Sequence, residues 1–96
     1  MQITIKSNIK DLIPNYLDNR QKDVGRLTEL LASSDFDEIR AIAHNMKGIG
    51  APYGFQFITD IGLEIENAAK AGNADEIRRL LDRFVEFLGE LTIVYE

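Results

Sequence analysis

The chain has no cysteine and only one histidine among its 96 residues. The lack of cysteine excludes disulfides, thiolate nucleophiles and thiol metal sites, and it fits a cytoplasmic protein. A single histidine cannot complete the usual ligand set of a zinc ion, and no second imidazole is present to act as the base of a serine hydrolase. The sequence therefore predicts neither a metal site nor a hydrolase triad.

Long apolar runs and runs of basic residues are also missing. No apolar stretch reaches the ~18 residues of a membrane span, and no signal-peptide pattern begins the chain, so we expect a cytoplasmic protein. The net charge of −5 disfavours nucleic acid and membranes as partners. Hydrophobic residues make up 45% of the chain and charged residues 28%, as in an ordinary globular protein, and the length favours a single domain over residues 1–96.

Apolar residues recur at helical spacing in successive segments with short connections between them. The first long helix should end near residues 32–34. Asp35 is a candidate N-cap for the next helix, with Glu38 in the capping-box position. Pro52 disfavours the helical conformation at the residue before it, so this second helix should close near that point.

Two further helices follow. The third covers about residues 55–71, and Asn73 opens the fourth with a second capping box. Residues 92–95 are β-prone, which leaves the end of the fourth helix open. We therefore predict an all-α fold, an antiparallel four-helix bundle over residues 8–96. Residues 1–7 would form a short N-terminal arm, and residues 8–12 an extra helical turn before the first long helix.

The single histidine, His44, lies in the middle of the second helix. At about 100° of rotation per residue, it falls roughly 160° from the centre of the apolar arc and should face water. The arc itself consists of Ile39, Ile42, Ala43, Met46, Ile49, Gly50 and Tyr53.

The residues beside His44 on the exposed face are Arg40, Lys47, Gly48 and Ala51, at positions whose side chains meet on a helix surface. A glycine inside a helix costs roughly 0.5–1 kcal/mol relative to alanine, so Gly48 needs a reason. Close approach of another molecule to the imidazole would supply one.

The spacing His44-x-x-Lys47-Gly48, with a further glycine six residues on, resembles the histidine-containing phosphotransfer (HPt) domains of two-component phosphorelays. Residues 35–44 look like the family's approach to its histidine. The family's next helix resembles the segment that contains Gly54, Ile58, Ile61, Gly62, Ile65, Glu66, Ala68, Ala69 and Gly72. The likeness covers about half of the chain, and its signal is strong because it joins a motif to its helical context.

This resemblance implies that His44 is phosphorylated and that Lys47 assists it. A neutral imidazole nitrogen would attack a phosphoryl group held on an aspartate, and the ordinary histidine pKa of ~6.5 leaves much of the ring neutral near pH 7. The Lys47 ammonium would lie beside the phosphoryl oxygens.

The implied partners are the receiver domains of response regulators and of hybrid sensor histidine kinases. We expect no cofactor on this chain, and the magnesium ion would come from the receiver's aspartate site. The chain has no ATP-binding segment, so it should be a phosphoryl carrier and not a kinase. We expect a monomer.

Other residues are interpreted from their helical position. Arg40, Gly48 and Ala51 would form the docking surface with His44. Tyr53 is interpreted as a core or helix-end residue, with contact to a partner as the alternative, and Phe57 as an exposed aromatic contact. Four acidic residues are interpreted as helix-surface and capping charges: Glu64, Glu66, Asp75 and Glu76.

Two other functions remain open. The chain could be a helical interaction module that keeps the bundle but transfers no phosphate; the presence of His44, Lys47 and Gly48 on one face speaks against it. It could also be the phosphoacceptor domain of a larger chemotaxis-type histidine kinase, which would use the same histidine chemistry.

Overall fold

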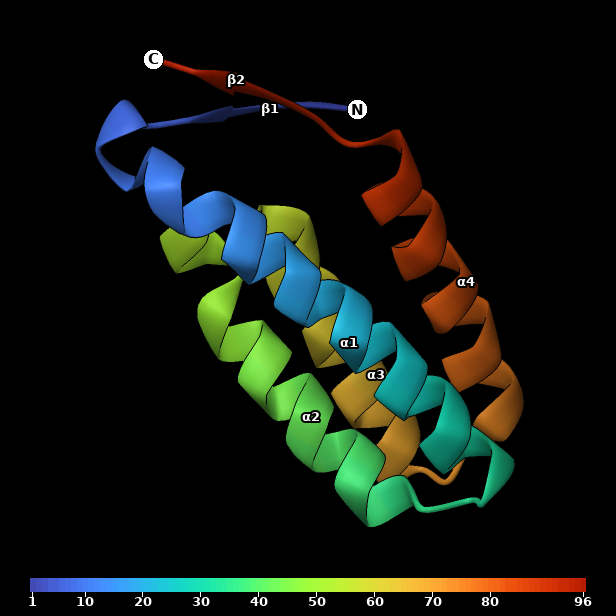
Figure 1. Cartoon of the computed structure of the whole chain (residues 1–96). Coiled ribbons are helices and arrows are strands. Elements are labelled where there is room, and N and C mark those ends of the chain that lie inside the picture. The colour runs from blue at the N-terminus through green and yellow to red at the C-terminus, as the bar shows by residue number, and fades with distance from the viewer.

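The computed structural model describes residues 1–96 and contains four α-helices. In Figure 1, α1 and α3 run in one direction along the molecule, and α2 and α4 run in the other. The predicted antiparallel four-helix bundle is therefore confirmed. The helices are α1 (Ile13–Ala32), α2 (Phe36–Ile49), α3 (Gln56–Lys70) and α4 (Ala74–Glu90).

Two of the helices begin at the predicted capping residues. The Asp35 carboxylate accepts a hydrogen bond from the Glu38 amide at 3.3 Å, and the Asn73 side chain accepts one from the Glu76 amide at 3.1 Å. Each cap satisfies an amide at the start of a helix that has no partner within the helix. Gly72 separates α3 from α4 in the left-handed region, at φ +63°, which suits a residue without a Cβ.

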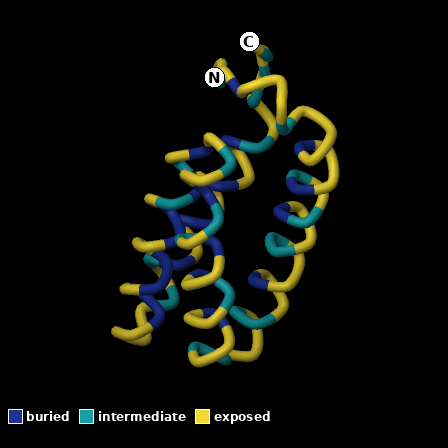
Figure 2. Tube along the Cα trace, turned by 90° about the vertical axis from the view of Figure 1, so that its left-hand side faces the viewer, coloured by how far each residue is buried: buried dark blue, intermediate teal, exposed yellow.

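The second helix ends as its proline requires. After Ile49 the chain passes through Gly50 into a short 3₁₀ turn over Ala51–Tyr53, and Gly54 then reverses it at φ +93°. Figure 2 shows the buried residues on the sides of the helices that face one another. The largest side chains of this core include Leu27, Ile39, Met46, Ile58, Ile65, Ile77 and Phe84.

The two ends of the chain form a small sheet that the all-α prediction did not include. Strand β1 (Gln2–Ile5) pairs in parallel with strand β2 (Thr92–Tyr95), and Ile3 lies opposite Ile93. The sheet lies across one end of the bundle in Figure 1. Describing residues 92–95 as part of a helical bundle was therefore wrong: Leu91 turns extended (φ −72°, ψ 127°), and the β-branched residues after it pair with the N-terminal segment.

A 3₁₀ turn over Ser7–Leu12 joins β1 to α1, and Pro14 lies in the first turn of α1, where its missing N–H is harmless. Ile5 is buried at 2% exposure and ties the sheet to the core. None of the helices combines the length and the apolar character that crossing a membrane would demand.

Candidate functional site

His44 lies on the outer side of α2, as the helical wheel predicted. Its side chain is 68% exposed, whereas Ala43 and Met46 on the opposite side are fully buried. Packing of this buried side against the core fixes the rotation of α2 about its axis, and the imidazole therefore points to solvent.

The imidazole has a partner that the sequence interpretation missed. Glu66 of α3 places Oε2 2.7 Å from His44 Nδ1 and Oε1 2.9 Å from Lys47 Nζ. Its side chain is only 7% exposed. The interpretation of Glu66 as a surface charge was therefore wrong. One signal was present: Glu66 falls within the buried arc of α3, between Ile65 and Ala69, and a carboxylate there requires a charged or hydrogen-bonded partner.

Gly62 explains why α3 comes close enough for this contact. A Cβ on Gly62 would lie 2.7 Å from the Lys47 amide nitrogen and 2.9 Å from the Ala43 carbonyl oxygen. Only glycine therefore allows the two backbones to approach at this level. Glu66 follows one helical turn later and faces His44 across the seam between the helices.

The charge of Glu66 decides how the imidazole is protonated. The hydrogen bond from the Lys47 ammonium, and then the one from His44, lower the pKa of Glu66 to about 2. Glu66 is thus ionised near neutral pH and can only accept hydrogen bonds. Nδ1 of a neutral His44 must carry the proton that it donates to Glu66, and this leaves the lone pair on Nε2.

The residues around His44 form a hollow of about 340 Å³. It is lined by Asp37, Arg40 and Ala41 of α2 and by Glu66 and Lys70 of α3. Arg40 and Lys70 are both exposed, and neither has a carboxylate within 4.0 Å. Arg40 thus lies beside the imidazole as the sequence indicated, and Lys70 joins it from the neighbouring helix.

Gly48 and Ala51 follow His44 in the chain, whereas Arg40 precedes it. A Cβ on Gly48 would meet no atom within 4 Å, so the surface is open there. Ala51 is exposed, and its amide donates a hydrogen bond to Thr59 Oγ1 at 2.7 Å. The same hydroxyl donates to the Lys47 carbonyl at 3.0 Å, which ties the end of α2 to α3.

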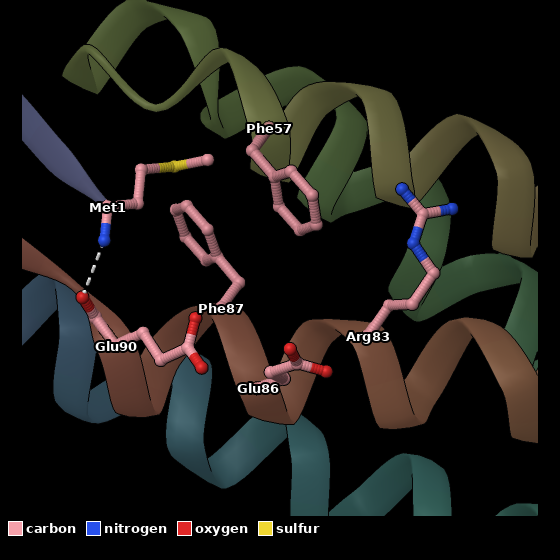
Figure 3. Close-up of a pocket in the computed structure, with 6 residues that line it drawn as sticks. All are labelled: Met1, Phe57, Arg83, Glu86, Phe87 and Glu90. Atoms are coloured by element: carbon pink, nitrogen blue, oxygen red, sulfur yellow. Dashed lines mark hydrogen bonds between the residues drawn. The ribbon is translucent and has the colours of Figure 1, made fainter.

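The aromatic residues belong to the packing of the bundle. Tyr53 is half-buried and stacks on Tyr16 with ring centroids 4.4 Å apart, which fits its interpretation as a core or helix-end residue. Phe57 is half-buried and stacks on Phe87 at 4.3 Å, so its interpretation as an exposed contact was wrong. Figure 3 shows these two rings facing each other, with the Arg83 guanidinium near Phe57.

The chemistry available at the site is that of an oriented nucleophile beside positive charge. The Nε2 lone pair points away from the partner of Nδ1, and the imidazole is largely open to solvent. No three His, Asp or Glu side chains are grouped so that they could hold a metal ion.

The family of the chain is shown by its similarity to known proteins. Neither the curated proteins nor the solved structures gave a match. A family model described as Hpt domain matches residues 11–92, which include all four helices from Ile13 to Glu90. Because this match covers far more than half of the 96-residue chain, the protein belongs to the Hpt domain family.

Proposed function

We propose that the protein carries a phosphoryl group on Nε2 of His44, which it takes from and returns to the aspartates of receiver domains. Hpt domains are phosphotransfer modules of two-component signalling. The observation that carries the proposal is the Glu66 contact at 2.7 Å, because it holds the proton on Nδ1 and leaves Nε2 as the nucleophile.

The transfer step needs no base. The Nε2 lone pair attacks phosphorus, the bond from phosphorus to the aspartyl oxygen breaks, and its electron pair stays on the receiver's carboxylate. The ring becomes positively charged, because Nε2 now carries the phosphoryl group while Nδ1 keeps its proton. The ionised Glu66 carboxylate, 2.7 Å from Nδ1, stabilises that charge. Return of the phosphoryl group reverses each change.

Lys47 acts in this proposal as a positioning residue. Its ammonium lies 2.9 Å from Glu66 Oε1, so it fixes the carboxylate that in turn orients the imidazole. The exposed Gly48 and Ala51 leave the approach to His44 open for a receiver. The receiver would supply the magnesium ion, and the chain would act as a cytoplasmic monomer without kinase activity of its own.

The test is to incubate the protein with a receiver phosphorylated on its aspartate, with magnesium present, and to follow the phosphate. We expect an acid-labile, base-stable phosphate on the wild type and none on His44→Gln, with equal helicity by circular dichroism. No label from several receivers would contradict the proposal and favour an interaction module. Label from a histidine kinase with ATP, but from no receiver, would indicate the phosphoacceptor domain of a kinase.

A further inference from the structure

Two positively charged side chains near the imidazole take part in none of the ion pairs described so far. Arg40 on α2 and Lys70 on α3 line the hollow of about 340 Å³ at His44. Both are exposed, and no carboxylate lies within 4.0 Å of either. Lys47, in contrast, is held by Glu66 at 2.9 Å, and these two charges offset each other.

Because α2 and α3 are antiparallel, Arg40 and Lys70 lie at the same height along the long axis of the two helices. His44 faces Glu66, Arg40 precedes His44 by one helical turn, and Lys70 follows Glu66 by one turn, so Arg40 and Lys70 lie across from each other. Side chains on a helix lean toward its N-terminus. The imidazole therefore leans toward the level of Arg40, and Lys70 leans back toward Glu66. Arg40 itself leans toward Asp37, but it lines the same hollow as His44.

A phosphoryl group on Nε2 brings about two negative charges to this level. Glu66 is the nearest charged partner of the ring and repels those charges, while Lys47 is already paired with it. The other acidic group of the hollow, Asp37, precedes His44 by two helical turns, about 10 Å along the axis. The cations placed to receive the phosphoryl oxygens are thus Arg40 and Lys70.

We propose that Arg40 and Lys70 form an anion cradle that holds the oxygens of the phosphoryl group on His44 and of the donor that delivers it. This inference rests on the proposed function and adds the residues that balance the charge of the group transferred. The ligand is a phosphoryl dianion, which an arginine fork and a lysine ammonium both bind well.

The experiment uses phosphoramidate, a small phosphoryl donor, so that a loss of rate cannot come from lost docking of a receiver. Nε2 attacks its phosphorus, and the nitrogen–phosphorus bond of the donor breaks. The donor nitrogen, already protonated in the phosphoramidate zwitterion, leaves as ammonia with the electron pair of that bond. The rate of phosphohistidine formation is followed by intact mass for the wild type, Arg40→Gln, Lys70→Gln and the double variant. Lys22→Gln is the matched control, because Lys22 is an exposed lysine of α1 that pairs with Asp18 at 3.4 Å.

We expect each single substitution at the cradle to slow phosphorylation about threefold to tenfold at low salt, and the double variant to lose more. The losses should shrink as salt is added, and Lys70→Arg should retain the rate. Lys22→Gln should match the wild type. Circular dichroism checks folding, which should be unchanged because both cradle side chains are exposed.

The outcomes separate the two proposals. If the wild type is labelled at His44 but the cradle variants react as fast as Lys22→Gln, the cradle is wrong and the proposed function stands. If neither phosphoramidate nor a phosphorylated receiver labels the wild type, the proposed function fails and the cradle fails with it.

Discussion

Replacing Glu66 by glutamine should remove one of the two hydrogen bonds that this side chain accepts. The reactive form of His44 depends on both. The carboxylate accepts from His44 Nδ1 at 2.7 Å and from Lys47 Nζ at 2.9 Å. A glutamine of the same shape offers one oxygen and one NH₂ group, so it can accept from only one of these two donors.

Each orientation of the amide has a defined cost. If its oxygen faces Nδ1, the NH₂ group faces the Lys47 ammonium, two donors meet, and Lys47 moves away. If it turns over, the NH₂ group donates to Nδ1, which must then give up its proton, and Nε2 becomes protonated and loses its lone pair. We expect a loss of about 10- to 100-fold in the rate of phosphoryl transfer, the range found when the carboxylate that orients a metal-binding histidine is removed.

Two measurements check this prediction. The first is the rate of phosphate transfer from a phosphorylated receiver to wild type and to Glu66→Gln. The second is the ¹⁵N chemical shifts of the imidazole, which tell a protonated ring nitrogen from an unprotonated one; the wild type should carry its proton on Nδ1 when neutral. Transfer at the wild-type rate by Glu66→Gln would refute the reasoning, as would a wild-type ring protonated at Nε2.

Three further predictions concern packing, docking and pH. Gly62→Ala should lower the free energy of unfolding by about 1–3 kcal/mol in urea denaturation, because its Cβ would lie 2.7 Å from the Lys47 amide nitrogen. Gly48→Ala, whose Cβ meets nothing within 4 Å, should instead stabilise the helix by about 0.5–1 kcal/mol; it should slow transfer from a receiver but not phosphorylation by phosphoramidate. The pKa of Glu66 is about 2 against an ordinary 4.5, so its contribution to stability should be complete above about pH 4.5 and lost toward pH 2. The difference in unfolding free energy between wild type and Glu66→Gln should therefore shrink as the pH falls from about 4.5 to 2. A difference that stays constant would contradict the lowered pKa of Glu66.

The features predicted correctly from the sequence are those with a local cause. The caps at Asp35 and Asn73, the end of α2 near Pro52 and the outward direction of His44 each depend on residues within two helical turns. These features can be predicted from the sequence because they do not depend on contacts between different helices.

The features that were missed depend on residues distant in the sequence. Glu66 and His44 are 22 positions apart, and their meeting depends on how closely α3 approaches α2. The pairing of β1 with β2 joins Ile3 to Ile93, so although residues 92–95 were recognised as β-prone, their partner at the other end of the chain was not. Helical spacing gave the face on which Glu66 lies, but it could not say that an imidazole and an ammonium would be there to pair with it.

The reactive site belongs to one pair of helices. His44, Lys47 and Arg40 come from α2, and Glu66 and Lys70 come from α3, while α1, α4 and the terminal sheet contribute no residue to the hollow. Changes in α1 or α4 that leave the packing intact should therefore alter stability without altering the protonation of His44. A slide of α3 along α2 by about 1.5 Å, the rise of one residue, would instead move the carboxylate away from Nδ1. The close backbone contact at Gly62 sets how near α3 lies to α2, so this glycine allows the Glu66 carboxylate to reach the imidazole and the ammonium of α2.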